Sequence, residues 1–207
     1  MRSKSGYEIM KFDIRAVDGV ARRGTLTLPR GVVNTPAFMP VGTGGTVKAM
    51  TPDSLAATGS DIILANTYHL MLRPGAEIVR SLGGLGKMMG WPGPILTDSG
   101  GFQIMSLSKL TKIDRKIGAI FKSHIDGKKI ILSPEKSIQV KKEIDSDILM
   151  VLDECPKLTM DKKLISKAID ISTDWAKRSK IQFVEEKNKS LLVIVQGEFF
   201  QDLRAFS

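Results

Sequence analysis

Three polar residues capable of catalytic chemistry stand directly after apolar runs of the sequence: Asp98, Asp153 and Gln196. Carboxylates can transfer protons or act as nucleophiles, and an amide can both donate and accept hydrogen bonds. After Asp98 the chain turns through Gly100 and Gly101, which lack a Cβ and let the backbone come close to a ligand. The pattern predicts a site for proton transfer or covalent catalysis on a polar ligand.

The apolar runs are typical of strands in a parallel sheet, because they alternate with helical segments along the chain. Five strands are expected, over residues 36–41, 61–65, 94–97, 147–152 and 191–195. Right-handed crossover connections bring the carboxyl ends of parallel strands to the same rim. The side chains expected to converge at this rim are those of Asn66, Asp98, Asp153 and Gln196.

Helical signals lie between these strands. Thr51 and Pro52 suit the cap and first turn of one helix, and the segment Ser133-Pro134-Glu135 suits the start of another. Further helices are expected over residues 74–82 and 160–183. The buried face of the second of these is expected to contain Leu164, Ile165, Ala168, Ile169, Trp175 and Ala176.

Two hairpins interrupt the strand–helix alternation. The N-terminal segment, residues 1–30, has alternating runs at residues 12–16 and 24–28, which predict a hairpin that caps the floor of a barrel. Residues 121–132 predict an inserted hairpin, with Asp126 and Gly127 as a two-residue type I′ turn.

The size and composition of the chain bound its architecture. Its 207 residues, 42% of them hydrophobic and 26% charged, indicate globular material rather than a disordered chain. A closed eight-stranded parallel barrel needs about 250 residues, so any barrel formed by the single domain expected over residues 1–207 would be incomplete. Residues 31–207 would supply its first five strand–helix units.

The net charge of +9 fits a polyanionic partner, because basic side chains on phosphates release condensed counterions. The basic residues are scattered, however, and many proteins are this basic without binding RNA. The single cysteine, Cys155, excludes an internal disulfide and indicates a reducing compartment. No apolar stretch approaches the ~20 residues that span a bilayer, so we expect a cytoplasmic protein without membrane contact.

Three segments resemble the tRNA-guanine transglycosylases, or queuine tRNA-ribosyltransferases, and fall in the order of that family. They are LTDSGGFQ at residues 96–103, IILANTYHLMLRPG at residues 62–75, and FKSHIDG at residues 121–127 followed by LSPE at residues 132–135. The family exchanges guanine at the tRNA wobble position for a 7-deazaguanine base, preQ1 or queuine. The resemblance implies a TIM (β/α)8-type barrel, truncated here after about five of its eight parallel strands, with tRNA and the base as partners.

The resemblance also implies roles for individual residues. Asp98 would be the general acid/base and part of the base pocket. Asp153 and Gln196 would bind the edge of the purine, and Phe102 would stack on its face. The backbone expected close to the base is that of Ser99, Gly100 and Gly101.

Other features of the family would lie beyond Ser207. These are its nucleophilic aspartate, its last barrel strands and its zinc site, a cysteine cluster with a histidine. No cofactor and no metal ligand are therefore expected in this chain. Cys155 follows Asp153-Glu154 as it does in the bacterial branch of the family, which uses preQ1.

Each site residue also has a simpler interpretation. Asp98 could bond to backbone beyond its strand in an Asx-type turn. Asp153 could cap a helix or turn that begins near Cys155. Gln196 with Gly197 could form an ordinary strand-to-helix turn.

Two further features are expected to have structural roles only. His69 and His124 are far apart in the sequence and lack metal-ligand spacing, so we expect hydrogen-bonded structural residues rather than catalytic groups. Residues 42–46 are glycine-rich but lack the P-loop lysine and the dinucleotide-binding spacing, which favours a flexible loop.

Three functional hypotheses follow. The chain could be part of a working transglycosylase whose other strands and nucleophile come from a second polypeptide or from a longer product. It could be a pseudoenzyme that keeps base or tRNA affinity without exchange. It could also be an interaction subunit that pairs with a full-length relative, because an open sheet edge invites a partner. A homodimer or pairing with a C-terminal fragment is a further expectation.

Overall fold

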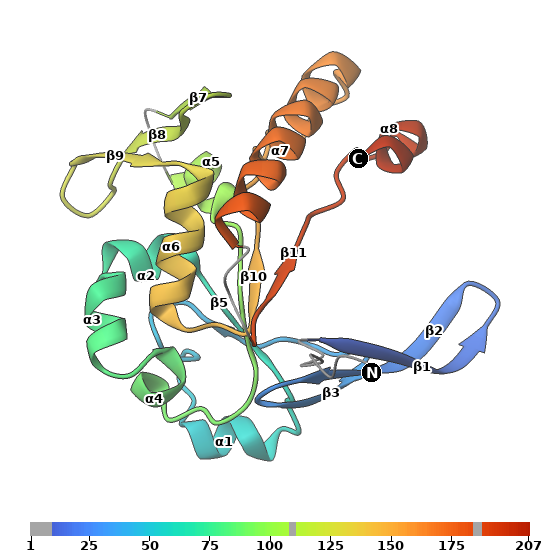
Figure 1. Ribbon diagram of the computed structural model, residues 1–207, viewed down its shortest axis with the longest axis vertical. Coiled ribbons are helices and arrows are strands. Elements are labelled where there is room, and N and C mark those ends of the chain that lie inside the picture. Colours follow the sequence, from blue (N-terminus) through green and yellow to red (C-terminus); the bar gives the residue numbers. More distant parts are fainter. Residues whose placement is uncertain (1–9, 108–110, 184–187) are drawn as a thin grey trace, which may run out of the picture.

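The structure of the protein is a computed structural model that describes residues 10–107, 111–183 and 188–207. It has an α/β architecture in which helices gather around a short parallel sheet (Figure 1). An antiparallel sheet from the N-terminal segment projects to one side of this body, at the lower right of the view. In the described parts of the chain, no helix combines the length and the apolar character needed to cross a membrane.

The N-terminal sheet has three antiparallel strands in chain order: β1 (Lys11–Asp18), β2 (Ala21–Leu28) and β3 (Gly31–Thr35). The pairing of β1 with β2 confirms the hairpin expected within residues 1–30. The third strand was not expected from the sequence, because its five residues show no long alternation of apolar and polar side chains.

The central sheet has five parallel strands in the spatial order β11-β10-β6-β5-β4. In chain order they are β4 (Val41–Gly42), β5 (Ile63–Ala65), β6 (Ile95–Thr97), β10 (Ile148–Met150) and β11 (Ser190–Leu192). The parallel pairing expected for these strands is confirmed. Because β4 and β11 lie at opposite edges, the sheet formed by the described strands is open rather than closed.

The start of the first strand of this sheet was predicted too early in the sequence. Residues 36–41 were expected to form it, but the ladder begins only at Val41. Pro36 and Pro40 have no backbone N–H to donate, and proline is therefore rare inside a paired strand. The other four strands begin at or within two residues of their expected starts.

Eight helices are described: α1 (Pro52–Ala57), α2 (Thr67–Leu72), α3 (Ala76–Ser81), α4 (Leu85–Met89), α5 (Gly101–Leu107), α6 (Pro134–Ile144), α7 (Lys162–Phe183) and α8 (Gln201–Phe206). Both expected caps are present. Thr51 Oγ1 accepts a hydrogen bond from the Ser54 N–H at 3.2 Å, and Ser133 Oγ accepts from the Lys136 N–H at 3.1 Å. These caps satisfy N–H groups that have no partner within the first helical turn.

Short helices replace the single helix expected over residues 74–82. The helix in that region, α3, is preceded by α2 and followed by α4, neither of which was expected. Gly75 and Gly84 immediately precede α3 and α4 with φ angles of 105° and 93°. Glycine readily adopts a positive φ, which does not occur within a right-handed helix. The helical region is therefore divided at these two glycines.

The inserted hairpin belongs to a third sheet, formed by β7 (Lys112–Asp114), β8 (Gly118–Lys122) and β9 (Lys129–Leu132). The hairpin is confirmed, but its two-residue type I′ turn was wrong, because residues 123–128 connect the paired ends. A type I′ turn needs positive φ at both central residues, and of the two only Gly127 has it, at 72°. The Ser123 hydroxyl instead accepts from the Ile125 N–H at 3.2 Å and stabilises a longer loop.

The long helix α7 closes the core over the central sheet. Trp175 is fully buried, and its Nε1–H donates to the Arg115 carbonyl at 2.9 Å. Most of the expected buried face is confirmed, but Leu164 is 53% exposed, because it lies one position outside the buried stripe. Ile171 and Trp175 share a core cluster with Phe121 of β8 and with Leu152, in the segment that follows β10, so α7 packs against both the inserted sheet and the end of the central one.

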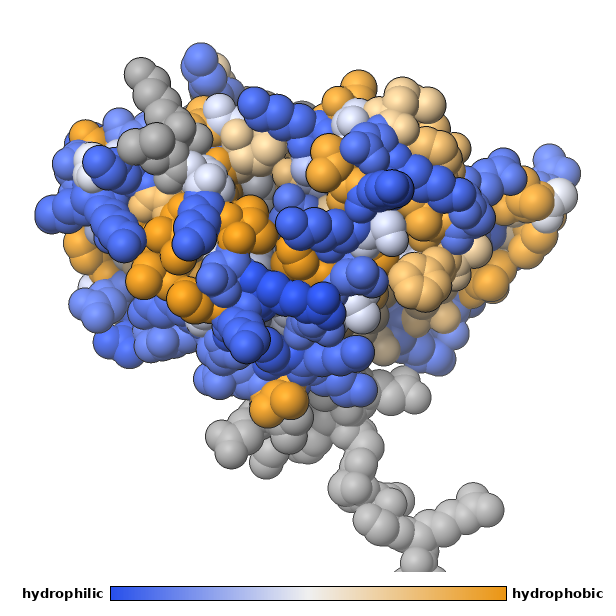
Figure 2. All heavy atoms as spheres, turned by 90° about the horizontal axis from the view of Figure 1, so that it is seen from above, coloured by the Kyte–Doolittle hydropathy of each residue, from blue (hydrophilic) through white to orange (hydrophobic). Residues whose placement is uncertain are grey.

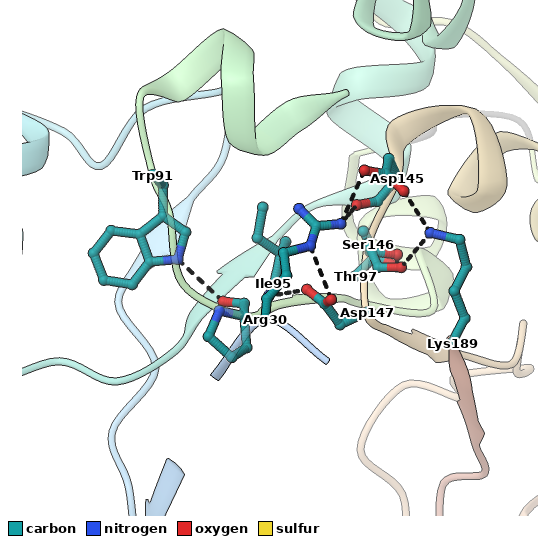
Figure 3. A network of polar contacts seen from close by, with 9 residues as sticks. Arg30, Trp91, Ile95, Thr97, Asp145, Ser146, Asp147 and Lys189 are labelled. Atoms are coloured by element: carbon teal, nitrogen blue, oxygen red, sulfur yellow. Dashed lines mark hydrogen bonds and ion pairs between the residues drawn. The ribbon is translucent and has the colours of Figure 1, made fainter. Parts of the chain in front are cut away.

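A polar network joins the amino ends of the central strands to the N-terminal sheet (Figure 3). Arg30, in the turn between β2 and β3, bonds to the carboxylates of Asp145 and Asp147. Lys189 Nζ donates to Asp145 Oδ1 at 2.6 Å and to the Ser146 carbonyl at 3.0 Å. The turn, the end of α6 and the starts of β10 and β11 are thereby held together.

Candidate functional site

Asp98 is fixed at the carboxyl end of β6 by the neighbouring strand end. Its Oδ2 accepts from Asn66 Nδ2 at 2.6 Å, and its Oδ1 accepts from the Thr67 N–H at 2.8 Å. The Thr67 hydroxyl donates to the Asp98 carbonyl at 2.7 Å. Because the carboxylate bonds to the end of β5 rather than to the backbone after Asp98, the Asx-turn alternative is not what the structure shows. The residue stays partly exposed, so a ligand can reach it.

Asp153 and Gln196 form a second polar pair, at the ends of the segments that continue β10 and β11. Gln196 Nε2 donates to Asp153 Oδ2 at 3.0 Å and to the Glu154 carbonyl at 2.8 Å. A carboxylate and a carbonyl oxygen can only accept, so the amide nitrogen of Gln196, and not its oxygen, must face them. Asp153 Oδ1 and Gln196 Oε1 are buried without a hydrogen-bond partner among the residues that the structure describes.

The glycine turn after Asp98 brings the two polar pairs together. A Cβ on Gly101 would lie 2.4 Å from Asp153 Oδ1, so only glycine leaves room for that carboxylate. Gly100 has a φ of 85° and lies against Thr67 and Tyr68. The Ser99 hydroxyl accepts from the Gly101 N–H at 3.1 Å at the start of α5. The structure therefore brings together Asn66 with Asp98 and Asp153 with Gln196, and Gly101 in the turn after Asp98 adjoins the second pair.

The simpler interpretations of Asp153 and Gln196 have different outcomes: Asp153 does not cap a helix, whereas Gln196 does lie in a strand-to-helix connection. In the described chain after Asp153, the next helix begins only at Lys162, so Asp153 caps no helix near Cys155. Gly197 and Glu198 have φ angles of 116° and 46°, and α8 begins a few residues later at Gln201. Gln196 is thus in a strand-to-helix connection, as its simpler interpretation had it, and its side chain also contacts Asp153.

Burial raises the pKa of the titratable groups at and after Asp153. Burial raises the pKa of Asp153, while interactions with Ser99, Gln196 and Lys141 act in the opposite direction. Burial and the neighbouring Asp153 charge also raise the pKa of Glu154. The Cys155 thiol has its pKa raised to about 11 by burial and by neighbouring carboxylates, so it is protonated at neutral pH and is a poor nucleophile.

Phe102 and Gln103 begin α5 beside this rim. The Phe102 ring is 59% exposed, which leaves an aromatic face available on the side of the molecule where the strands end. Gln103 Oε1 is buried and has no hydrogen-bond partner in the described parts of the chain. Gln103 lies in the resembling segment at residues 96–103, but no role was assigned to it from the sequence.

The structure places His69 and His124 side by side, which their separation in the sequence did not suggest. Their ring centroids are 5.9 Å apart, and the Tyr68 ring stacks on His124 at 5.5 Å. The Tyr68 hydroxyl is hydrogen-bonded to His124 Nδ1 at 2.9 Å, as expected for a structural histidine. Burial and His124 lower the pKa of His69, and Asp98 acts to raise it. This cluster therefore adjoins Asp98.

Lys141 is a buried ionisable residue that the sequence reasoning missed. Lys141 is a residue of α6, and its side chain is fully buried. Burial lowers its pKa to about 8, and interactions with Asp98 and Asp153 act to raise it. The signal was in the sequence, because Lys141 lies three residues from both Ile138 and Ile144, on the apolar face of a helix.

No group of three or more histidine, cysteine, aspartate or glutamate side chains that could hold a metal ion occurs within residues 10–107, 111–183 and 188–207. The zinc site implied by the resemblance does not fit these residues, whose single cysteine, Cys155, lies beside carboxylates rather than beside further thiolates.

The fold and site define an α/β protein with an open parallel sheet, whose strands carry carboxylate and amide side chains at their carboxyl ends. A sequence model of the family described as queuine tRNA-ribosyltransferase matches residues 18–207. The chain belongs to this family, as the three resembling segments indicated.

Curated relatives named queuine tRNA-ribosyltransferase agree with this assignment. The relative from Mesorhizobium japonicum is 56% identical over 186 residues, which cover 90% of this chain and 49% of the relative. Those from Ruegeria pomeroyi and Agrobacterium fabrum are each 54% identical and cover 95% and 96% of this chain, respectively. The chain spans about half the length of the curated relatives it matches.

Proposed function

We propose that this chain carries the base-binding half of a tRNA-guanine exchange site. The observation that supports this most strongly is the pair of buried acceptors, Asp153 Oδ1 and Gln196 Oε1, that lack partners among the described residues. A buried acceptor without a partner costs free energy until a donor reaches it. The edge of guanine or of a 7-deazaguanine carries adjacent N–H donors, at N1 and at the exocyclic amine, which suit two neighbouring acceptors.

The remaining rim residues would hold the base from other sides. Phe102 would stack on its face, because an exposed aromatic ring is a common platform for an unstacked base. Ser99, Gly100 and Gly101 would line the pocket with backbone, and a Cβ at Gly101 would collide with Asp153.

Asp98 would be the general acid/base of the exchange. In this proposal a carboxylate nucleophile forms a bond to C1′ of the ribose as the bond from C1′ to guanine N9 breaks. The departing base takes the electron pair and receives a proton from the acid. The arriving base then returns a proton to Asp98 as its nitrogen attacks C1′ and releases the nucleophile. Asn66 and Thr67 hold the carboxylate for this role.

The nucleophile and the zinc site are proposed to lie in the half of the relatives that this chain does not span. We also propose that this half completes a TIM-type barrel with the domain formed by residues 1–207. Both edges of the open sheet adjoin apolar grooves that further strands and helices could cover. The groove beside β11 includes Met10, Phe183, Leu191 and Val193, and the groove beside β4 includes Ala37, Phe38 and Val41.

tRNA is the proposed macromolecular partner. The net charge of +9 favours a phosphate backbone, and affinity should fall as salt rises. Figure 2, seen from above the view of Figure 1, has hydrophilic side chains over most of this face with separate hydrophobic groups between them. preQ1 rather than queuine is the proposed incoming base, from the position of Cys155 after Asp153-Glu154. Action on tRNA also supports the cytoplasmic location expected from the sequence.

Base binding tests the pocket directly. Titration of the chain with guanine or preQ1, followed by calorimetry, should give saturable binding that Asp153→Asn weakens by about 10- to 100-fold, because an amide N–H₂ replaces an acceptor. Asp18→Asn, an exposed change at the end of β1, is the matched control and should bind as the unmodified chain does. Equal affinity for Asp153→Asn and the unmodified chain would remove Asp153 from the pocket.

Exchange tests the catalytic proposal. Labelled guanine should enter tRNA when the chain is mixed with a polypeptide covering the second half of the Mesorhizobium japonicum relative. Asp98→Ala should lower this rate by about 10²- to 10⁴-fold, the usual contribution of a general acid/base. Activity that survives the change would exclude this role, and exchange by the chain alone would show that no second half is needed.

A non-catalytic subunit or pseudoenzyme that binds tRNA is the alternative, favoured by the open edges at β4 and β11. It predicts salt-sensitive tRNA binding and a complex in the ultracentrifuge, either a homodimer or a pair with the second half, but no exchange with any added polypeptide.

A further inference from the structure

The inserted sheet holds a large share of the positive charge of the chain. Residues 112–132 contain six basic and two acidic side chains, a net charge of +4 out of the +9 of the whole sequence. Both carboxylates already have local partners. Asp114 accepts from two backbone N–H groups of its own turn at 3.0 Å, and Asp126 pairs with Lys128 at 3.3 Å. Among the residues that the structure describes, neither Lys122 nor Lys129 has an ion-pair partner.

The two faces of this sheet have different surroundings. The inner face, with Ala119, Phe121 and Leu132, belongs to the core cluster that also contains Tyr68 of α2 and Ile104 of α5. Successive side chains of a strand point to opposite sides, so the alternate positions form an outer face. Its residues, matched across the three strands, are Lys112, Ile120, Lys122, Lys129 and Ile131. All three lysines are exposed, so the outer face is a basic surface that solvent reaches.

Lys122 and Lys129 lie directly opposite each other on β8 and β9. Like charges at directly opposed positions destabilise a sheet. Lysines on edge strands prevent unwanted pairing with other chains, which explains Lys112 on β7 and Lys129 on β9. Lys122 is on the central strand of this sheet, where there is no open edge to protect. The pair of opposed lysines therefore has no structural explanation in the sheet itself.

The opposed lysines adjoin a loop that is packed beside the candidate catalytic residue. This loop, residues 123–128, joins the paired ends of β8 and β9. Within it the His124 ring stacks on Tyr68, with centroids 5.5 Å apart, and the Tyr68 hydroxyl is bonded to His124 Nδ1 at 2.9 Å. Tyr68 belongs to α2, and the first residue of that helix, Thr67, donates its N–H to Asp98.

The other side of the sheet lines the cavity beside Asp153. Ile113 and Ala119 border this cavity together with Gly101 and Asp153. Figure 1 shows β7, β8 and β9 at the upper left, on the same side of the central sheet as α5. Because the inserted sheet is one wall of the cavity, a nucleic acid that places a base there must lead its neighbouring nucleotides over the adjoining surfaces, of which this sheet is one.

We propose that the outer face of the inserted sheet binds the phosphate backbone of tRNA, with Lys122 and Lys129 as its main contacts. A phosphate held by the two ammonium groups replaces their mutual repulsion with two favourable charge contacts and releases counterions from the RNA. The choice of tRNA as the polyanion rests on the proposed function, whereas phosphate binding by the opposed lysines does not.

Chemical protection tests the surface in the unmodified chain. Lysines are acetylated by a limiting reagent with and without a tRNA transcript, and the extent of acetylation at each position is measured by mass spectrometry. Acetylation of Lys122 and Lys129 should fall several-fold when tRNA is bound. Lys87 of α4, which lies near the lower end of the view in Figure 1, should react equally in both samples. Equal acetylation of Lys122 and Lys129 with and without bound tRNA would overturn the proposal.

Two variants separate phosphate binding from the stability of the sheet. Lys122→Ala/Lys129→Ala removes both charges. Lys122→Glu places an opposite charge across from Lys129, which favours the sheet but repels phosphate. The matched control, Lys11→Ala/Lys87→Ala, removes two lysines from β1 and α4 instead. The changed side chains are exposed, so all three proteins are expected to fold, and urea unfolding checks this.

The salt dependence of tRNA affinity is the readout for these variants. Lys122→Ala/Lys129→Ala should bind tRNA about 10- to 100-fold more weakly at about 0.1 M salt, and the slope of log affinity against log salt should decrease by about 2. Lys122→Glu should also weaken binding although it stabilises the sheet. The control should keep the slope of the unmodified chain. Equal affinities and slopes in the two double variants would mean that only net charge matters and would contradict the proposal.

Guanine binding separates this surface from the proposed base site. Guanine has no phosphate, so its affinity should be the same in the lysine variants and in the unmodified chain. If no protein binds guanine but tRNA binding loses its salt dependence in Lys122→Ala/Lys129→Ala, the base site fails and the phosphate surface stands. If guanine binds and every variant binds tRNA equally, the surface is wrong while the base site stands.

A protein partner for the same face gives a different result. In that case Lys122→Ala/Lys129→Ala would leave tRNA affinity unchanged and would prevent a complex with the second half of the Mesorhizobium japonicum relative in the ultracentrifuge. This outcome would overturn the proposal and make the outer face a protein interface.

Discussion

Arg30 and Asp147 connect the N-terminal sheet to the central sheet through a single buried carboxylate. Arg30 Nε lies 2.9 Å from Asp147 Oδ1, and Asp147 Oδ2 accepts from the Ile95 N–H at 2.8 Å (Figure 3). The Asp147 side chain is only 3% exposed. Burial raises the pKa of Asp147, and the Ile95 N–H and Arg30 act to lower it, so its ionised form depends on these partners.

We expect Arg30→Ala to destabilise the protein by about 2–3 kcal/mol, because it leaves a buried carboxylate without its cation. Urea unfolding followed by circular dichroism measures this. Lys11→Ala breaks the exposed pair with Asp13 and is the control, with an expected loss below about 1 kcal/mol. Equal losses of unfolding free energy in Arg30→Ala and Lys11→Ala would show that the Arg30 contact stabilises the protein no more than an exposed ion pair does.

Gly101→Ala should disturb the site through Asp153. The new Cβ would lie 2.4 Å from Asp153 Oδ1 and 2.7 Å from its carbonyl oxygen, so one of them must move. Overpacking of this kind costs about 1–3 kcal/mol, and guanine affinity should fall by at least about tenfold. Calorimetry measures both effects. Gly44→Ala, where a Cβ meets nothing within 4 Å, should change neither, and a harmless Gly101→Ala would contradict the close contact.

Acid should destabilise the protein partly through His69. Burial, followed by the neighbouring His124, lowers its native pKa below the ordinary value of 6.5. The unfolded chain therefore binds this proton more tightly, so the stability from neutral His69 is present above pH 6.5 and is lost as the pH falls through that lowered pKa. Urea midpoints at a series of pH values should fall less steeply on acidification in His69→Gln. If the urea midpoints of His69→Gln and of the unmodified protein fall in parallel with decreasing pH, His69 makes no contribution to the acid destabilisation.

Alkaline pH should have the opposite effect through Lys141. Its pKa is lowered from 10.5 in the unfolded chain to about 8 in the native protein, so between these values the unfolded chain holds the extra proton. Stability from this group rises with pH across that window, by up to about 3 kcal/mol as an order of magnitude, and is lost as the pH falls back through it. The pH dependence of urea unfolding should lose this rise in Lys141→Met and keep it in Lys136→Met. Equal slopes in all three proteins would contradict the lowered pKa.

The sequence by itself determined the order of strands and helices, because apolar runs, caps and prolines act over a few residues. Thr51 and Ser133 cap helices as expected, and the parallel strands after the first start near their expected positions. It also determined the family, through three segments whose residue types and spacing match it. Local turn geometry was less determined, because in the inserted hairpin the Ser123 hydroxyl outweighs the preference of Asp126-Gly127 for a two-residue turn.

Only the tertiary structure decided which side chains share an environment. The contacts of Asn66 with Asp98 and of Gln196 with Asp153 join residues more than 30 positions apart. The neighbouring histidines and the burial of Lys141 also depend on how helices and sheets pack. Burial and long-range electrostatics arise only when distant segments exclude water together, so neither the unpartnered acceptors nor the altered pKa values can be read from local sequence.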